Sequence, residues 1–166
     1  LPNGEVLHVL ASHPTPPGFD GRARRNNHRN HDEVQFWSDY LNQAPYVEDD
    51  SGRTGGLHAN ARFLVMGDLN ADPDDASIFR NAIRHLIGHE RVDGDAVPEA
   101  SPARQADYPD LDPDDTSRWQ ARIDYVLPSS NLSVQDAGVW RPRPASVPDV
   151  PVSDHFPVWM DVRVGP

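Results

Sequence analysis

The chain has 166 residues, no cysteine and a formal net charge of −11. Disulfides and thiolate–metal sites are therefore excluded, and a protein that coats nucleic acid through charge is disfavoured. The length suits one domain or a large piece of a bigger one, and no stretch approaches the ~20 apolar residues of a membrane-spanning helix.

The first part of the chain predicts one strand and one helix. An apolar run over 6–11 is typical of a strand, and a loop rich in Pro, Gly, Arg and Asn follows over 13–29. Asn30 can cap a helix, with Glu33 three residues later, and apolar side chains then recur on one face. This helix should end before Pro45, because proline cannot continue it.

The middle of the chain predicts a buried strand and a second helix. A continuous apolar run over 63–66 indicates the strand, which ends at Gly67. A cap at Asp75 or Ser77 should start the helix. The residues expected to face the core are Ile78, Ala82, Ile83 and Leu86. Residues 88–118 are rich in turn residues and predict a long excursion.

The last part predicts strands over 122–127, 132–140 and 156–164, with a proline-rich loop over 141–151. Strands mixed with helices indicate an α/β, or α+β, fold, in which polar residues at strand ends commonly form the site. The sequence contains no internal repeat and no interdomain linker, so residues 1–166 should belong to a single domain.

Gly67-Asp68-Leu69-Asn70 places two oxygen-bearing side chains directly after a predicted strand. Asp68 and Asn70 are two residues apart, so in an extended segment they point the same way. Together they could hold one divalent metal ion or one attacking water. For this motif alone, the alternative is a loop turn stabilised by the aspartate side chain.

Ser153-Asp154-His155 joins a carboxylate to an imidazole before the last predicted strand. In a strand these two side chains diverge, which predicts separate tasks. Asp154 suits metal binding, whereas His155 suits water activation or stabilisation of charge on phosphorus. The alternative is a surface turn.

Two further residues fit the same chemistry. Asp124 lies within a predicted strand, where it could fix the tautomer of a histidine or face solvent, because a buried carboxylate without a partner is costly. His13 follows the first strand and precedes a stiff proline-rich segment. Paired with an acid it could protonate a leaving oxygen or bind phosphate, and otherwise it is structural.

A local basic cluster lies after His13 in this acidic chain. It comprises Arg22, Arg24, Arg25 and Arg29. Guanidinium groups match the geometry of phosphate, so we expect Arg25 and Arg29, together with Asn30, on the substrate side of the site. A solvated loop is the alternative.

These segments resemble the endonuclease/exonuclease/phosphatase superfamily, whose members share a deoxyribonuclease-I-like, four-layered α/β sandwich with mostly antiparallel sheets. The motifs follow the family order over nearly the whole chain. They are a strand that ends at His13, Gly67 to Asn70, the Ile-Asp-Tyr-Val-Leu strand with Asp124, and Ser153 to Val158. His-Pro-Thr-Pro-Pro and the segment from Arg29 to Glu33 also resemble a bacterial subgroup that is often secreted.

The resemblance implies which residues would act on the attacking water, the phosphate and the metal ion. Asp68 would orient or deprotonate the attacking water, and Asn70 would hold the phosphate and help to place the metal. Asp154 would bind the cation. Mg²⁺ or Mn²⁺ is expected, and Ca²⁺ is a further candidate.

The resemblance also implies roles for the two histidines. His155, oriented by Asp124, would stabilise the charge that develops on phosphorus or act as a base. His13 would contact the phosphate or the leaving group. The subgroup resemblance implies an extracellular or periplasmic location.

The chain departs from the family at its beginning. The family domain starts with another half that supplies an Asn and a metal-binding Glu, each after a strand. Nothing before His13 can hold them, since Asn3 and Glu5 are too close to the first residue. We therefore expect a partial domain whose N-terminal half is missing, with an open apolar face that binds the missing segment or a second copy of the chain.

The sequence thus predicts a divalent-metal-dependent, nuclease-like phosphoester hydrolase, either a phosphodiesterase or a phosphatase, in which water attacks phosphorus in line. Its substrate is a phosphate ester, and the charge does not favour nucleic acid. One alternative is a catalytically incompetent half-domain that acts as an interaction or structural module. A second is a calcium-binding extracellular domain, suggested by the Asp-rich loops at 68–75 and 110–115.

Overall fold

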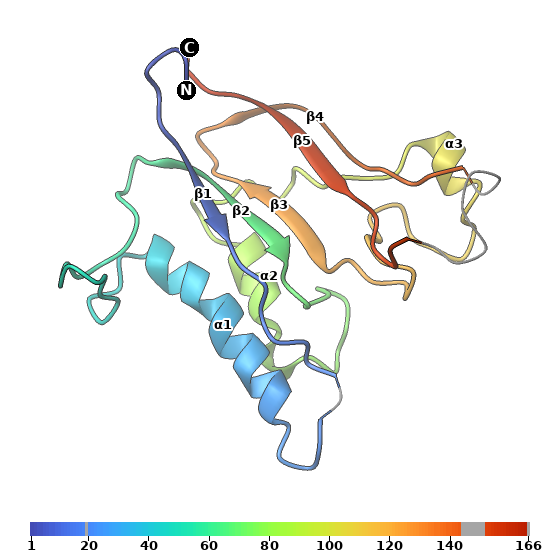
Figure 1. Ribbon diagram of the computed structural model, residues 1–166, viewed down its shortest axis with the longest axis horizontal. Coiled ribbons are helices and arrows are strands. Elements are labelled where there is room, and N and C mark those ends of the chain that lie inside the picture. Colours follow the sequence, from blue (N-terminus) through green and yellow to red (C-terminus); the bar gives the residue numbers. More distant parts are fainter. Residues whose placement is uncertain (19, 144–151, 166) are drawn as a thin grey trace.

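The computed structural model describes residues 1–18, 20–143 and 152–165, and its strands form two sheets (Figure 1). The first sheet contains, in spatial order, β1 (Leu7–Ala11), β2 (Arg62–Asp68) and β3 (Asp124–Pro128). β1 runs parallel to β2, and β3 runs antiparallel to it. The second sheet is antiparallel and contains β4 (Ser133–Val139) and β5 (Val158–Arg163).

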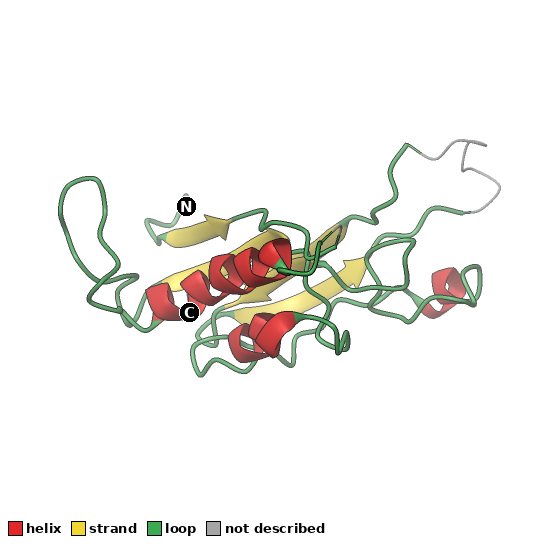
Figure 2. Cartoon of the chain, turned by 90° about the horizontal axis from the view of Figure 1, so that it is seen from below, coloured by secondary structure: helices red, strands yellow, loops and turns green. Residues whose placement is uncertain are grey.

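Two helices, α1 (Arg25–Leu41) and α2 (Ala82–Ile87), pack against each other and share one apolar core with the first sheet (Figures 1 and 2). β2 and β3 contribute alternate residues to this core, such as Phe63 and Val65, which are fully buried, and β1 contributes Leu10. Two short helical segments lie in the connections, a 3₁₀ turn at Phe79–Asn81 and α3 at Pro102–Gln105. None of the helices in the described ranges is long and apolar enough to cross a bilayer.

Helix α1 begins at Arg25, so the expected start at Asn30 is wrong. The carboxylate of Asp20, in the preceding loop, accepts hydrogen bonds from the N–H groups of Asn26 (2.9 Å) and Asn27 (2.8 Å). These bonds satisfy donors of the first turn in place of a local cap. Asn30 is an interior residue of the helix, so its side chain does not cap the first turn and can bond to other parts of the chain.

Helix α2 also begins later than expected. Its cap is Asn81, whose side chain accepts a hydrogen bond from the N–H of Arg84 at 3.3 Å, rather than Asp75 or Ser77. The four expected core residues, Ile78, Ala82, Ile83 and Leu86, are all buried. Of the expected loop over 141–151, residues 144–151 lie outside the described residues.

The excursion over 88–118 folds around a buried arginine. Arg141 is 1% exposed, and its guanidinium donates to the carbonyl oxygens of Asp112 at 2.5 Å and Asp115 at 2.9 Å. The acidic loop therefore surrounds a cation that belongs to the chain itself. In the described ranges, the cluster of potential metal ligands includes Asp68, from the first of the two Asp-rich loops, and no residue of 110–115.

Gly67 allows the chain after β1 to approach β2 closely. Its φ is +139°, and a Cβ atom there would lie 2.1 Å from the carbonyl oxygen of Ser12. The N–H of Ser12 in turn donates to the carbonyl of Met66 at 3.2 Å. Only glycine fits this conformation and this contact, so Gly67 fixes how the segment after β1 lies against the end of β2.

Replacing Gly67 by alanine should lower the free energy of unfolding by at least about 2 kcal/mol, because the added carbon meets a backbone oxygen on a strained backbone. Chemical denaturation followed by circular dichroism measures the change. Gly21→Ala is the matched control, since nothing lies within 4 Å of its Cβ position. Equal losses in the two variants would contradict this account.

Candidate active site

Three of the predicted site residues meet where β2 ends and β3 begins. Asp68 is the last residue of β2 and Asp124 the first of β3, and the two are direct partners in the antiparallel register. His155, from the segment before β5, joins them. The three residues offer ligand atoms that all lie within 4.8 Å of one another. Segments far apart in the sequence thus form one cluster of two carboxylates and an imidazole.

Asp124 orients the His155 ring. Its Oδ2 lies 2.9 Å from Nδ1 of His155, and because an ionised carboxylate can only accept, Nδ1 carries the proton. The other ring nitrogen, Nε2, lies 3.9 Å from Oδ1 of Asp154. Burial lowers the pKa of His155, but the hydrogen bond and charge of Asp124, with further charges from Asp68 and Asp154, raise it to a net value above the ordinary one.

Asp68 contacts both the loop after β1 and the loop after β2. Its Oδ2 lies 3.3 Å from Nε2 of His13, and its Oδ1 accepts the N–H of Asn70 at 2.9 Å. The turn offered as the plain alternative for this motif is therefore present, and the carboxylate also belongs to the cluster. Burial raises the pKa of Asp68, the Asn70 N–H lowers it, and the Asp124 charge raises it again, with a net increase.

Asn30 has a structural position. Its side chain is 1% exposed, and its Nδ2 donates to the carbonyl oxygens of Thr15 and Leu69, each at 3.0 Å, and of Asn70 at 3.2 Å. This burial does not fit the substrate contact expected from the sequence. Instead, the amide joins the loop that carries His13 to the loop after β2.

Two more residues on the same face of α1 hold the loop after β1. The Glu33 carboxylate accepts the N–H of Thr15 at 2.5 Å, and Nε1 of Trp37 donates to Oγ of Ser12 at 2.7 Å. Asn30, Glu33 and Trp37 follow one another at three and four residues and so lie on one side of the helix. Through them α1 contacts this loop on both sides of His13. The histidine itself has a side chain that is 70% exposed.

The other predicted site residues lie around the cluster. Asp154 has a side chain that is 58% exposed. Nδ2 of Asn70 donates to the carbonyl of Pro14 at 3.1 Å. Arg29 is exposed, lies 3.3 Å from Glu33 and lines a second hollow that includes His13. Arg25 is exposed on the first turn of α1 and forms no ion pair with any described residue.

Thr116 joins the two sides of the cluster. No sequence pattern identifies it, because it lies at the end of the turn-rich excursion. Its Oγ1 accepts the N–H groups of Ile123 at 3.0 Å and Asp124 at 2.9 Å. Its carbonyl accepts the N–H of Phe156 at 2.7 Å. The residue is 1% exposed, so one buried threonine fixes Asp124 relative to the residue that follows His155.

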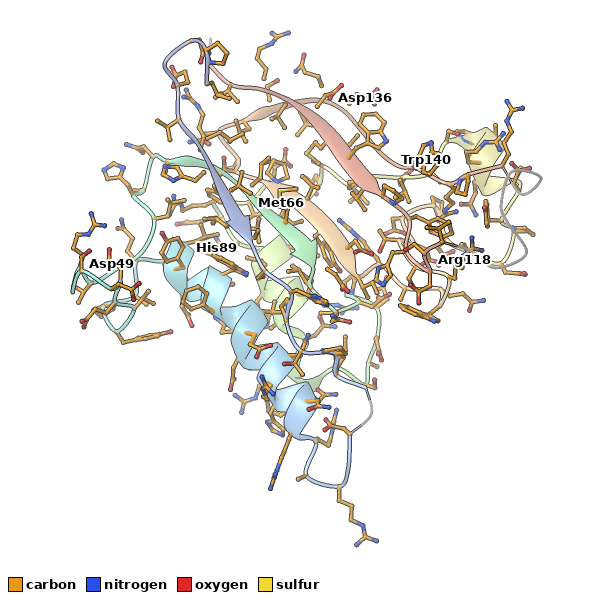
Figure 3. All side chains as sticks on the ribbon, in the orientation of Figure 1. Asp49, Met66, His89, Arg118, Asp136 and Trp140 are labelled. Atoms are coloured by element: carbon orange, nitrogen blue, oxygen red, sulfur yellow. The ribbon has the colours of Figure 1, made fainter. Side chains whose placement is uncertain are left out.

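The cluster lies in a cleft of about 580 Å³. Most of the lining is apolar, and Met66 and Trp140 are part of it (Figure 3). The charged or titratable side chains in the lining are Asp68, Arg118, Asp124, Tyr125 and His155. A concave, mainly apolar site with a few convergent polar groups is the usual form of a ligand pocket.

The cluster fits a divalent cation. Asp68 and Asp124 face each other across neighbouring strands, and their mutual repulsion helps to raise the pKa of Asp68. A cation between them would offset this repulsion, and Mg²⁺ characteristically uses one or two carboxylates together with water and substrate phosphate. Asp154, exposed beside His155, offers a further carboxylate.

Replacing Thr116 by valine should lower the free energy of unfolding by about 1–3 kcal/mol, because two backbone N–H groups lose their acceptor in a buried place. Thr116→Ser keeps the hydroxyl and is the control. Urea denaturation of both variants measures the change. If the valine and serine variants are equally stable, side-chain packing and not the two hydrogen bonds accounts for the contribution of Thr116 to stability.

His155 should titrate above the ordinary histidine pKa of about 6.5 in metal-free protein, and Asp124→Asn should lower its pKa. A raised pKa means that the folded state binds the proton more tightly than the unfolded state. The resulting stability is complete below the unfolded pKa and is lost as pH rises through the folded value. Histidine NMR titration in the presence of EDTA measures both pKa values, and an unchanged pKa in Asp124→Asn would contradict the coupling.

Comparisons with known proteins identify the family and the fold of the chain. The chain matches the model of the Endonuclease/Exonuclease/phosphatase family over residues 5–155. It is also similar to the solved structure of an endonuclease/exonuclease/phosphatase from Beutenbergia cavernae, with 21% identity and a TM-score of 0.51. That match covers 95% of this chain and 36% of the other, so this chain spans about a third of that protein's length. No curated protein matches the chain significantly.

The structural likeness supports the fold, and the expected α+β class is confirmed. That residues 1–166 are only the later part of a domain stays a prediction, since the family model already matches from residue 5. Because this model matches most of the sequence, the chain belongs to the endonuclease/exonuclease/phosphatase family, whose members generally hydrolyse phosphoester bonds, often with a divalent metal.

Proposed function

We propose that this chain carries the hydrolytic site of a metal-dependent phosphoesterase, in which water attacks a phosphate ester in line with the leaving oxygen. The observation that carries the proposal is the convergence of Asp68, Asp124 and His155 in one cleft. Two close carboxylates and an oriented imidazole match the needs of this reaction, which are a cation site, a base and a group that stabilises charge.

Asp68 is the proposed base. Its raised pKa makes its carboxylate more basic than that of an ordinary aspartate, so it is better suited to accept a proton from water. The N–H of Asn70 holds one of its oxygens at 2.9 Å, which fixes the carboxylate plane. Asn70 is also proposed to contact the phosphate and to help to place the metal, as the family resemblance implies.

His155 is proposed to stabilise the negative charge that develops on the phosphoryl oxygens. Asp124 holds Nδ1–H, so the second ring nitrogen is available to the substrate. The raised pKa favours the imidazolium form more than in an ordinary histidine, and a protonated ring suits charge stabilisation better than proton abstraction. His13, exposed and next to Asp68, is proposed to contact the phosphate or to give a proton to the leaving oxygen.

Asp68, Asp124 and Asp154 are the proposed holders of Mg²⁺ or Mn²⁺, with Asn70 nearby. When bound, the cation would neutralise charge on the phosphate and polarise it toward attack. Arg29 lines a hollow together with His13, and Arg25 lies one turn earlier on α1. Both remain proposed contacts to parts of the substrate outside the cleft.

Additional polypeptide is proposed to complete the site. The cleft wall includes apolar groups open to solvent, among them Trp140 at 59% and Val152 at 94% exposure, and Val9 of the edge strand β1 is 57% exposed. Such surface is typical of an interface. The partner would be a further segment of the family domain or a second copy of the chain. An inactive half-domain with an interaction role is the second candidate that this surface favours.

Hydrolysis of bis-p-nitrophenyl phosphate and p-nitrophenyl phosphate with Mg²⁺ or Mn²⁺ tests the proposal. Asp154→Ala and His155→Ala should each lower kcat by about 10²–10⁴-fold, which is the scale of removing a group that acts in the transition state. Asp161→Ala on β5 and His85→Ala on α2 are controls, because both residues are exposed and outside the cleft.

Undiminished turnover in Asp154→Ala and His155→Ala would refute the assignment. The assay also tests completion of the site. We expect weak turnover by this chain alone and strong turnover by a longer polypeptide that contains it. Full metal-dependent turnover by this chain alone would contradict the need for a further segment.

A further inference from the structure

Arg118 is an unpaired cation in the cleft. Together with His155 it supplies the basic groups among the described lining residues. It forms no ion pair with any described residue, and its Nε is buried without a hydrogen-bond partner in the described chain. A buried donor without a partner is costly, and in a protein with a net charge of −11 a guanidinium group ordinarily finds a carboxylate. The Arg118 guanidinium is therefore a candidate binding group for an anionic ligand.

The backbone fixes Arg118 to the segment that carries His155. Its N–H donates to the carbonyl of Asp154 at 2.9 Å, and the neighbouring Ser117 pairs with His155 in an isolated β-bridge. These bonds fix the backbone of Arg118 relative to His155. Arg118 lines the cleft that contains His155 and also a smaller neighbouring hollow, so an anion in the cleft can contact both side chains.

The guanidinium group is also held by an aromatic ring. Its central carbon lies 5.3 Å from the centroid of Phe156, which is 3% exposed and bonded through its N–H to Thr116. Contact with a ring face orients the planar group and limits its rotamers. An arginine positioned in advance loses less entropy when it binds an anion.

Resting on the proposed function, we propose that Arg118 binds the non-bridging phosphoryl oxygens and makes the site selective for phosphomonoesters. Two N–H groups of one guanidinium match two oxygens of a phosphate. A terminal phosphate carries a second negative charge near neutral pH, whereas a diester carries one. The interaction with an otherwise unneutralised guanidinium is therefore stronger for the monoester.

Inorganic phosphate tests this assignment without catalysis. Isothermal titration calorimetry with phosphate, in the presence of Mg²⁺, should show binding to the parent chain. Arg118→Met should weaken it by about 10–100-fold, the loss expected for hydrogen bonds to a charged group. Arg118→Lys should fall between the two, because lysine keeps the charge but not the paired donors.

Arg80→Met is the matched control. Its guanidinium carbon also lies near a phenylalanine ring, 5.1 Å from Phe79, but the residue is exposed and outside the cleft. Its phosphate affinity should equal that of the parent. A thermal midpoint measured for every variant shows that each one is folded before its affinity is compared.

The selectivity is measured with two substrates on the most active form of the protein. Arg118→Met should lower kcat/KM for p-nitrophenyl phosphate at least tenfold more than for bis-p-nitrophenyl phosphate. Equal losses on the two esters would overturn the selectivity. Phosphate binding that is absent in the parent, or unchanged in Arg118→Met, would overturn the phosphate-binding role. Neither result bears on the proposed hydrolysis, which stands or falls on the Asp154→Ala and His155→Ala variants.

Discussion

The geometry of the site depends on the hydrogen bonds of one buried threonine. Thr116 accepts the N–H groups that begin β3 and, through its carbonyl, the N–H of Phe156. These bonds fix the distance between Asp124 and His155, whose side chains then meet at 2.9 Å. The bridge from Ser117 to His155 and the bond from the N–H of Arg118 to the carbonyl of Asp154 extend this junction. The excursion over 88–118 thus ends in the element that assembles the site.

A second constraint acts from the opposite side. One face of α1 holds the loop after β1 through Asn30, Glu33 and Trp37. Gly67 lets this loop lie against the end of β2, where a side chain would collide with Ser12. His13 therefore stays beside Asp68 although its own side chain is exposed. Helix packing and one glycine place an imidazole that the loop sequence alone would leave free.

Charge distribution explains how an acidic protein can bind an anion. Asp68 and Asp124 repel each other in a partly buried place, which favours a cation between them. The imidazole of His155 and the guanidinium of Arg118, which forms no ion pair with a described residue, supply basic groups in the same cleft. A net charge of −11 is therefore compatible with a phosphate substrate, because the local field differs from the average.

The sequence alone determined the order of the strands and of the two longer helices, four residues of the main core and the motifs that meet in the cleft. Apolar periodicity and polar residues at strand ends are local properties, so Asp68, Asp124 and His155 could be named without a fold. The start of α1 differs from the predicted one because its first turn is capped by Asp20, outside the helix, and because the Asn30 side chain bonds to the loop after β1. Local patterns cannot express such contacts.

Only the tertiary structure decided which polar residues are structural and which face the cleft. Asn30 and Arg141 bind backbone carbonyls and are buried, whereas Arg118, which has no distinctive sequence context, remains unpaired beside the cluster. The physical reason is that a hydrogen bond or ion pair between distant segments depends on their separation in space. That separation is fixed by packing and not by the spacing of residues along the chain.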